Sequence, residues 1–512
     1  MAGILPSKRV GTNYFKDITI LFVGSMMLAQ AIEQVGLHRR LALFLLSVVS
    51  SSIKWIMAGL MGVTAFISMW INNSAATSIM IPAAIAIIDE LQKHHDKVQE
   101  QTATQHNKKH ITFEEDVVRI EVNDYFYYST VSSAKPEHCS NTPINSMKKN
   151  HIDYQQLKTG FLIAVAYSAA IGGLATLVGT GPNIFVKGFT DDKGRHAFEI
   201  SFTNFLLFAL PIGVIMLIFC WLWLQLLYNR RELLPWLRKD QNDVESQHHL
   251  QSVLRKQYRD LGSFNWSEYT ITILFLLMVA LWTTREFSSY SGWKVIFRKD
   301  YVTDGTIAML IGTLPLILPD KNPFDKKWEY HPILQWDQVC KTFPWGVFML
   351  QGAGLAIADG FETSNLSATL ATLLQFVVGA SHIIVIFVTI LISAIFTEFT
   401  SNLTCASILF PVLDSIANTA NIHAARLILP SCMAVSLSFM LPIATPPNAM
   451  IFSSGSVKII DLIKVGFVMK IIGIVIILFS SMILLPPIFH IYPLAPIVDD
   501  TLLFNNSISQ GN

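Results

Sequence analysis

Long apolar runs alternate with polar breaks along most of the chain. Uninterrupted runs occupy residues 18–35, 41–60, 160–178, 203–228, 268–283, 306–318, 368–395 and 463–486, and interrupted ones occupy 55–90, 343–358 and 402–453. A helix needs about 20 apolar residues to cross the hydrocarbon core of a bilayer. Because lipid offers the backbone no hydrogen-bonding partner, these runs must be helical. The pattern predicts an all-α polytopic membrane protein.

The composition agrees with this prediction. Only 14% of the 512 residues are charged and 52% are hydrophobic, whereas soluble domains average about 25% charged residues. The net charge of +1 suggests no nucleic-acid partner. The five cysteines form no C-x-x-C pair, so neither a metal cluster nor a disulfide framework is indicated.

Two long polar segments interrupt the apolar runs, at residues 92–157 and 229–266. The second begins Asn229-Arg230-Arg231 and carries further basic residues. Basic segments next to membrane spans favour the cytoplasmic side, so both loops are predicted to lie inside. Near the C-terminus, Asn505 begins an Asn-x-Ser glycosylation pattern, which would matter only if the tail is outside.

An internal repeat is the most informative feature. Residues 68–82 and 397–411 superpose after a shift of 329 positions (402 − 73), which aligns Asn73 with Asn402. A hydroxyl residue precedes each Asn by five positions, and a Pro follows it by nine. Each copy is followed by a second matched motif, residues 179–183 and 444–448, and both of these read small-Thr-x-Pro-Asn. Two matched pairs in the same order indicate two related halves.

These motifs suit the binding of ions inside a membrane. Gly and Pro break a helix, and unpaired backbone is tolerated at membrane depth only where it is buried in protein or lines a cavity. Freed carbonyls can bind a hard cation such as sodium, and helix N-termini attract anions. The motifs contain no Lys or Arg, so an anion would be neutralised by sodium and helix ends. The alternative is that these polar residues only hold helices together.

Glu398 adjoins the second Asn motif and is the acidic residue of greatest interest. An intramembrane carboxylate is a functional candidate by default. Two interpretations stay open. Glu398 could be a proton or cation site, or it could form hydrogen bonds at a helix end.

At these motifs the sequence resembles the divalent-anion/sodium symporter family, solute carrier family 13, which carries a Ser-Asn-Thr motif twice. The counterparts are Asn72-Asn73-Ser74 and Ser401-Asn402-Leu403, while residues 171–183 and 439–449 resemble the two unwound segments of the family and residues 344–360 also fit. The resemblance covers essentially the whole chain. It implies an inverted repeat with two re-entrant hairpins and two unwound helices, and a scaffold domain plus a transport domain that works by an elevator motion. It further implies a homodimer, a plasma-membrane location, and sodium as coupling ion with no other cofactor.

The resemblance also implies roles for individual residues. Those implied for sodium binding are Ser68, Asn72, Asn73, Gly179, Thr397, Ser401, Asn402 and Ala444. Those implied for binding the substrate anion are Asn73, Ser74, Thr180, Gly181, Asn402, Leu403, Thr445 and Pro446.

The same resemblance divides the chain into segments. The first repeat comprises scaffold helices (1–54), a re-entrant hairpin (55–91), a cytoplasmic loop (92–157) and an unwound helix (158–190), followed by a linking helix (191–228) and a second cytoplasmic loop (229–266). The second repeat comprises scaffold helices (267–342), transport-domain helices with the other re-entrant hairpin (343–422), an unwound helix (423–455), and a last helix with an extracellular tail (456–512).

The sequence departs from the family pattern in several places. Asn72 replaces the first Ser, Ser74 replaces a Thr but keeps a hydroxyl, and Leu403 replaces a Thr and loses it. This leaves the choice among dicarboxylate, citrate and sulfate open. At the N-terminus, about fifty residues of the family pattern, or one and a half membrane helices, are expected to be missing.

The sequence therefore predicts a sodium-coupled symporter of di- and tricarboxylates such as succinate and citrate. The alternatives are a sodium-coupled sulfate carrier on the same fold, or a truncated paralogue that does not transport. An enzyme is disfavoured because no H-E-x-x-H, G-x-S-x-G or P-loop pattern occurs. A channel would instead show steady sodium-independent currents.

Overall fold

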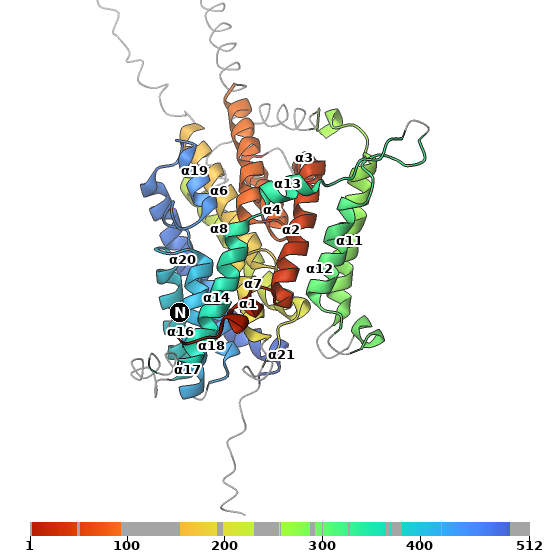
Figure 1. Ribbon diagram of the computed structural model, residues 1–512. Coiled ribbons are helices and arrows are strands. Elements are labelled where there is room, and N and C mark those ends of the chain that lie inside the picture. The colour runs from red at the N-terminus through yellow and green to blue at the C-terminus, as the bar shows by residue number, and fades with distance from the viewer. Residues whose placement is uncertain are drawn as a thin grey trace, which may run out of the picture.

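A computed structural model describes residues 3–48, 52–93, 154–191, 198–229, 255–256, 258–286, 292–298, 301–325, 328–364, 369, 381–420 and 422–491. Within these ranges the chain is helical, and the β pairing is limited to a single bridge between Pro319 and Pro332. The helices form one bundle, with α11 (Trp266–Arg285) and α12 (Asp304–Thr313) at one edge and α20 (Ile459–Ile483) at the opposite edge in Figure 1. The prediction of an all-α chain is confirmed.

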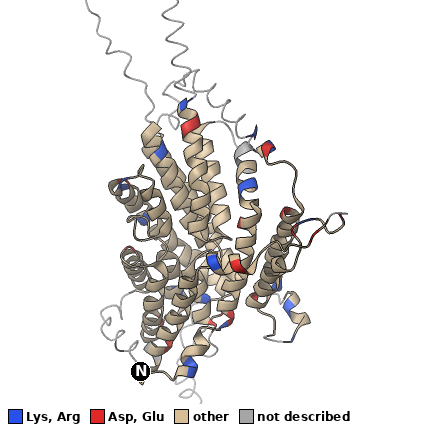
Figure 2. Cartoon of the chain, turned by 45° about the horizontal axis from the view of Figure 1, so that its top comes forward, with Lys and Arg blue, Asp and Glu red and all other residues tan. Residues whose placement is uncertain are grey.

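Six helical spans of the described chain are long and apolar enough to cross a membrane. They are Ser7–Val35, which joins α1 (Ser7–Asn13) to α2 (Asp17–Val35), then Asn73–Lys93, α6 (Tyr154–Leu174), α8 (Phe202–Tyr228), α11 and α20. Figure 2 shows these helices uncharged over most of their length. Large exposed apolar side chains along α8 and α20, such as Ile218 and Phe479, suit a lipid surface.

Local signals explain where several helices begin and end. Asn265 and Glu268 form a capping box at the start of α11, with Asn265 N donating to Glu268 Oε2 over 2.8 Å. Ser201 caps α8 by accepting from Asn204 N. The left-handed Gly36, with a φ of 76°, ends α2.

The apolar run over residues 41–60 contains a break between two helices. The sequence predicts that the apolar run 41–60 is helical, and α3 (Leu37–Val48) and α4 (Ile53–Ser68) both overlap it, with the extended residue Ser52 before α4. Ser52, a residue type that favours caps and turns, is the N-cap of α4. The run 306–318 is also shorter, because α12 gives way to the 3₁₀ turn η3 (Leu314–Leu316) at Pro315.

Four helix pairs are interrupted at the four motifs. Helix α4 ends before the first Asn motif, and the helix Asn73–Lys93 begins inside that motif. In the same way, α16 (His382–Phe396) ends before the second Asn motif and α17 (Asn402–Thr419) begins inside it. The small-Thr-x-Pro-Asn motifs separate α6 from α7 (Gly181–Thr190) and α18 (Ala425–Ala434) from α19 (Pro446–Ser453). Prolines at the first positions of α7 and α19 fit these starts, since proline is tolerated where no intrahelical N–H bond is made.

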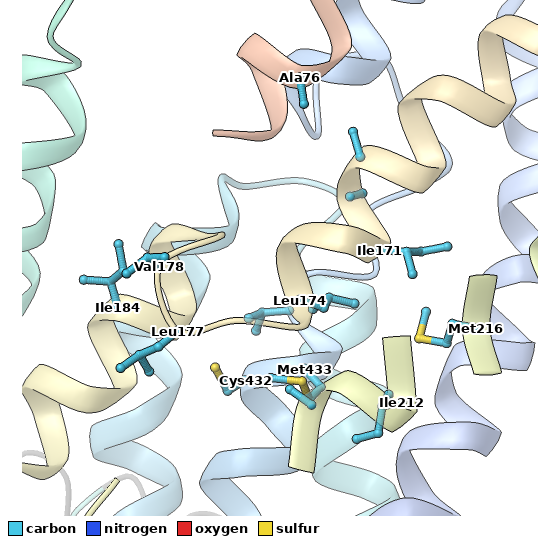
Figure 3. Close-up of a cluster of buried hydrophobic side chains, with 14 of the residues drawn as sticks. Ala76, Ile171, Leu174, Leu177, Val178, Ile184, Ile212, Met216, Cys432 and Met433 are labelled. Atoms are coloured by element: carbon cyan, nitrogen blue, oxygen red, sulfur yellow. The ribbon is translucent and has the colours of Figure 1, made fainter. Parts of the chain in front are cut away.

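The interrupted helices α6 and α18 lie inside the bundle, whereas α16 has one exposed apolar face. Helix α6 is buried along nearly its whole length and packs against α4, α8 and α19. The second set packs similarly, with α16 against α18 and α17 against α7 and α14 (Trp345–Thr363). Figure 3 shows Leu174, Leu177 and Val178 along the unwound stretch between α6 and α7, with Cys432 and Met433 of α18 beside it. The unwound backbone is thus enclosed by protein, as membrane depth requires.

The remaining elements are short or peripheral. They are η2 (Trp293–Ile296), α13 (Trp336–Thr342) and α21 (Leu485–Phe489). Most of both polar loops, the first part of the run 368–395, and Asn505 lie outside the described residues. Their predicted sidedness and glycosylation therefore stay predictions.

Candidate functional site

Three oxygen atoms meet at the first interruption. Ser68 Oγ lies 2.8 Å from Asn73 Oδ1 and 2.6 Å from the carbonyl oxygen of Ala169 on α6. Ser68 is fully buried and Asn73 is partly buried. A serine hydroxyl carries only one proton, so it cannot satisfy both acceptors at once. The cluster therefore has surplus lone pairs, as a cation site requires.

The second interruption repeats this arrangement with one addition. Thr397 Oγ1 lies 2.9 Å from Asn402 Oδ1 and also donates to the carbonyl oxygen of Val435, just beyond α18. Ser438 Oγ donates to the same Asn402 oxygen over 2.9 Å. Thr397, like Ser68, is fully buried. Two hydroxyl protons here serve two acceptors.

One asparagine in each half holds the unwound backbone in place. Asn183 Nδ2 donates to the carbonyls of Gly173, Leu174 and Thr176 at 3.2, 3.2 and 2.8 Å. Asn448 Nδ2 donates to Ser438 and Leu441 at 3.1 and 3.2 Å. A shift of 265 positions (448 − 183) carries Gly173 onto Ser438 and Thr176 onto Leu441. Asn183 and Asn448 therefore donate to backbone carbonyls at the same two positions of the repeat.

Glycines bring the first tip and its unwound segment together. A Cβ at Gly173 would collide with Asn73 Oδ1 and would lie 2.9 Å from the Thr180 methyl carbon. A Cβ at Gly179 would collide with the carbonyl of Gly173. Ser68, Asn73, Gly179 and Thr180 are thus gathered around Gly173.

Two threonines start helices at equivalent places. Thr180 and Thr445 are the N-caps of α7 and α19, both in extended conformation, with φ of −138° and −142°. Both hydroxyls are buried, and neither has a hydrogen-bond partner among the described residues. A buried unpaired hydroxyl costs about 1–3 kcal/mol. Beside a helix N-terminus, such a group suits an anionic partner.

The first residue of each Asn motif is a helix cap. Asn72 Oδ1 accepts from Ser74 N over 2.9 Å at the start of the helix Asn73–Lys93. Ser401 Oγ accepts from Thr404 N and lies 2.7 Å from Thr404 Oγ1. The side-chain oxygens of Asn72 and Ser401 are thus used to start helices, whereas those of Asn73 and Asn402 belong to the oxygen clusters.

The two halves touch where Leu403 lies. A Cβ at Gly181 would lie 3.5 Å from Leu403 Cβ, so the start of α7 packs against the start of α17. Cys432 of α18 adds a second link, with Sγ 3.5 Å from the Pro182 carbonyl oxygen. Ala444 and Thr445 are buried at the start of α19, which packs against α6 of the first half.

Glu398 lies beside the second cluster and is 2% exposed. Its carboxylate accepts from the backbone amides of Phe439, Met440 and Leu441 at 3.0, 3.2 and 3.3 Å. Lys470 of α20 pairs with it at 2.5 Å and donates to the Ala394 carbonyl over 2.7 Å. Of the two interpretations of Glu398, the contacts fit hydrogen bonding at a helix end.

Sequence reasoning missed four residues of this region, namely Gly173, Asn183, Ser438 and Asn448. The signal for two of them was present, because both small-Thr-x-Pro-Asn motifs end in these asparagines. Gly173 and Ser438 stand ten positions before them. Only the fold shows that Gly173 approaches Asn73 and that Ser438 approaches Asn402.

Comparison with known proteins gives a consistent result. Residues 3–491 match the family described as the sodium:sulfate symporter transmembrane region. The human Na(+)/dicarboxylate cotransporter 3 is 31% identical over 92% of this chain and 80% of its own length. The rat Na(+)/citrate cotransporter is 32% identical over 92% of this chain and 82% of its own length. The rabbit solute carrier family 13 member 2 is 33% identical over 94% and 82%.

These matches run through the whole described fold, including all four interrupted helix pairs. They confirm the predicted resemblance and a location in the membrane, and the family is one of transporters. The chain belongs to the sodium:sulfate symporter family, solute carrier family 13, whose members carry anions together with sodium.

Proposed function

We propose that this protein is a sodium-coupled symporter of small di- and tricarboxylates, with succinate and citrate as the first candidates. One observation carries the proposal. Two equivalent oxygen clusters, and two equivalent buried threonine hydroxyls that have no partner among the described residues, all lie at interruptions of membrane helices. Such pairs of broken helices are the usual place for substrate and coupling ions in secondary transporters.

Sodium would occupy the two oxygen clusters. In the first half, Ser68, Asn73 and the backbone near Gly179 would contribute ligands, and in the second half Thr397, Asn402 and the backbone near Ala444 would do so. Oxygen atoms are the ligands that hard cations prefer. Because Asn72 and Ser401 cap helices, their role would be to orient the neighbouring asparagines.

The anion would lie between the two halves, against Thr180 and Thr445 and the helix starts near Ser74, Gly181, Leu403 and Pro446. The amides at the start of α7 and α19 would face its carboxylates. The motifs themselves offer no Lys or Arg, so bound sodium would supply the positive charge. Anion binding would then require sodium, which couples the two fluxes.

The names of the relatives support the substrate class. Two of them are named for dicarboxylate and citrate cotransport. We further propose that the halves form an inverted repeat, that the interrupted helices move as a transport domain against a scaffold in a homodimer at the plasma membrane, and that sodium is the only coupling ion or cofactor.

Sulfate is the competing substrate, because the family description names it and Leu403 lacks the hydroxyl of the family motif. A test is uptake of radiolabelled succinate, citrate and sulfate side by side in cells expressing the chain, with sodium and then with choline. Asn73→Ala and Asn402→Ala would be measured alongside, with surface expression quantified.

Sodium-dependent carboxylate uptake that both variants abolish would support the proposal. Sodium-dependent uptake of sulfate alone would contradict the carboxylate proposal and show that the protein carries sulfate. Normal surface expression without uptake of any of the three anions would contradict transport and favour a paralogue that does not transport.

A further inference from the structure

The contacts of Glu398 differ from those of every other residue at the four interruptions, because a charged side chain there binds backbone amides of the neighbouring segment. We infer that Glu398 is a positioning residue for the second half of the site and that Lys470 is its counter-ion. In this role Glu398 carries neither a proton nor a sodium ion. The inference rests on the proposed function, since it concerns how one of the two sites is built.

The first step of the argument is an exchange of hydrogen-bond partners. In a continuous helix the amide of Phe439 would donate to the carbonyl of Val435, four residues earlier. Instead it donates to Glu398 Oε1 over 3.0 Å, and the Val435 carbonyl accepts from Thr397. By taking the amide, Glu398 leaves the Val435 oxygen for the cluster that contains Asn402.

The second step concerns the residues on either side of these amides. Ser438, which donates to Asn402 Oδ1, directly precedes the three amides that Glu398 holds. Leu441 supplies the last of these amides, and its backbone carbonyl accepts from Asn448 Nδ2 and from Ala444 N. Glu398 therefore fixes the segment between the cation cluster and the start of α19, where Thr445 lies.

The third step is charge. A buried carboxylate without a partner is very costly, and pairing with hydrogen-bond donors is the usual remedy. Lys470 Nζ lies 2.5 Å from Glu398 Oε1, and Lys470 is itself only 7% exposed. Together with the three amides, the lysine gives the carboxylate four donors. A group so enclosed would have to lose donors before it could bind a cation, so an anchoring role fits it better.

The experiment compares Glu398→Gln, Lys470→Met and the double variant with a matched control, Glu268→Gln. Glu268 also forms a buried ion pair, with Arg40 Nε at 3.0 Å, but it lies on α11 away from the interruptions. For each variant, surface-normalised uptake is measured against sodium concentration, and the purified full-length protein is melted in sodium and in choline.

Glu398→Gln is expected to raise the sodium concentration for half-maximal uptake about tenfold, a change of about 1.4 kcal/mol in binding. Lys470→Met is expected to lower the amount of folded protein most, because it leaves the carboxylate without a counter-ion. The double variant should recover folded protein but keep a raised sodium requirement. Glu268→Gln should lower stability and leave the sodium requirement within twofold of the original.

Several results would overturn the inference. One is a Glu398→Gln sodium requirement within twofold of the original, and another is an equal shift in Glu268→Gln. A third is loss of pH dependence in Glu398→Gln with unchanged sodium dependence, which would make Glu398 a proton carrier. These outcomes are separable from failure of the proposed function, in which the original protein itself shows no sodium-dependent uptake and no stabilisation by sodium.

Discussion

The two halves of the site share a framework but differ in how the tip of each interrupted helix pair is joined to its unwound segment. In the first half the Thr176 hydroxyl donates to the backbone carbonyl of Met69. In the second half the backbone amide of Leu441 donates to the side chain of Glu398. The offsets that align the repeats place Glu398 opposite Met69 and Leu441 opposite Thr176. In both halves the residue of the unwound segment donates and the residue at the tip accepts. The first half uses a side-chain donor and a backbone acceptor, whereas the second half uses a backbone donor and a side-chain acceptor.

The two oxygen clusters also differ, in the number of hydroxyl protons that they contain. Ser68 offers one proton to two acceptors, whereas Thr397 and Ser438 offer two protons to two acceptors. Gly173, the counterpart of Ser438, brings no hydroxyl. The first cluster therefore has fewer hydroxyl donors of its own than the second. If sodium binds at both clusters as proposed, this difference predicts unequal sodium affinities for the two halves.

The largest expected effect comes from making the first half resemble the second. Gly173→Ser would place a Cβ against Asn73 Oδ1 and close to the Thr180 methyl. Asn73 and Thr180 leave no room for the added side chain, so the tip and the unwound segment would have to move apart. Uptake should therefore fall about a hundredfold or more, equivalent to about 2.7 kcal/mol. Surface-normalised uptake checks this. The reverse change, Ser438→Gly, creates space and should cost far less, so equal losses in the two variants would contradict the comparison.

The next effect tests the asparagines that fix the unwound backbone. Asn183→Ala removes the donor to three buried carbonyls and Asn448→Ala removes the donor to two. Each side-chain NH2 carries two protons, so at about 1 kcal/mol for each proton donated both variants should lose about 2 kcal/mol. The second segment, however, keeps the three hydrogen bonds to Glu398. The melting temperature of the purified protein should therefore fall further for Asn183→Ala. A larger fall for Asn448→Ala would show that Glu398 does not support its segment.

The sequence predicted this site in part, and the physical reason is local chemistry. Broken helices could be placed at Asn73, Asn402, Thr180 and Thr445 because Gly, Pro and polar residues inside apolar runs have few other uses. The contacts between segments could not be predicted, since no spacing indicates that Lys470 meets Glu398 across 72 positions (470 − 398). The run 41–60 shows a related limit, because apolar content alone does not indicate the extended residue Ser52 before α4.

An intermediate effect distinguishes binding from structure at the two threonines. Thr180→Val and Thr445→Val remove buried hydroxyls that have no partner among the described residues. Removing an unsatisfied polar group should leave the melting temperature unchanged or raise it. If the hydroxyls bind the anion, the KM should rise about tenfold or more, since a hydrogen bond to a charged group contributes about 1.5–3 kcal/mol. Loss of stability with unchanged KM would mean that both hydroxyls are structural.

The smallest effect concerns the residue at which the halves meet. Leu403 is 6% exposed and packs against Gly181, in a position where the repeat otherwise carries the hydroxyl of Ser74. Leu403→Thr would restore a hydroxyl donor beside the start of α7 and would lose part of an apolar contact. We expect a change of about threefold in the ratio of carboxylate to sulfate uptake, because a hydrogen-bonding group discriminates between ligands more than a methylene does. The matched control is Leu403→Val, which has nearly the shape of threonine without its hydroxyl. If both variants change the ratio equally, the packing against Gly181 and not the hydroxyl sets the preference, and the lost family hydroxyl does not explain which anion the protein carries.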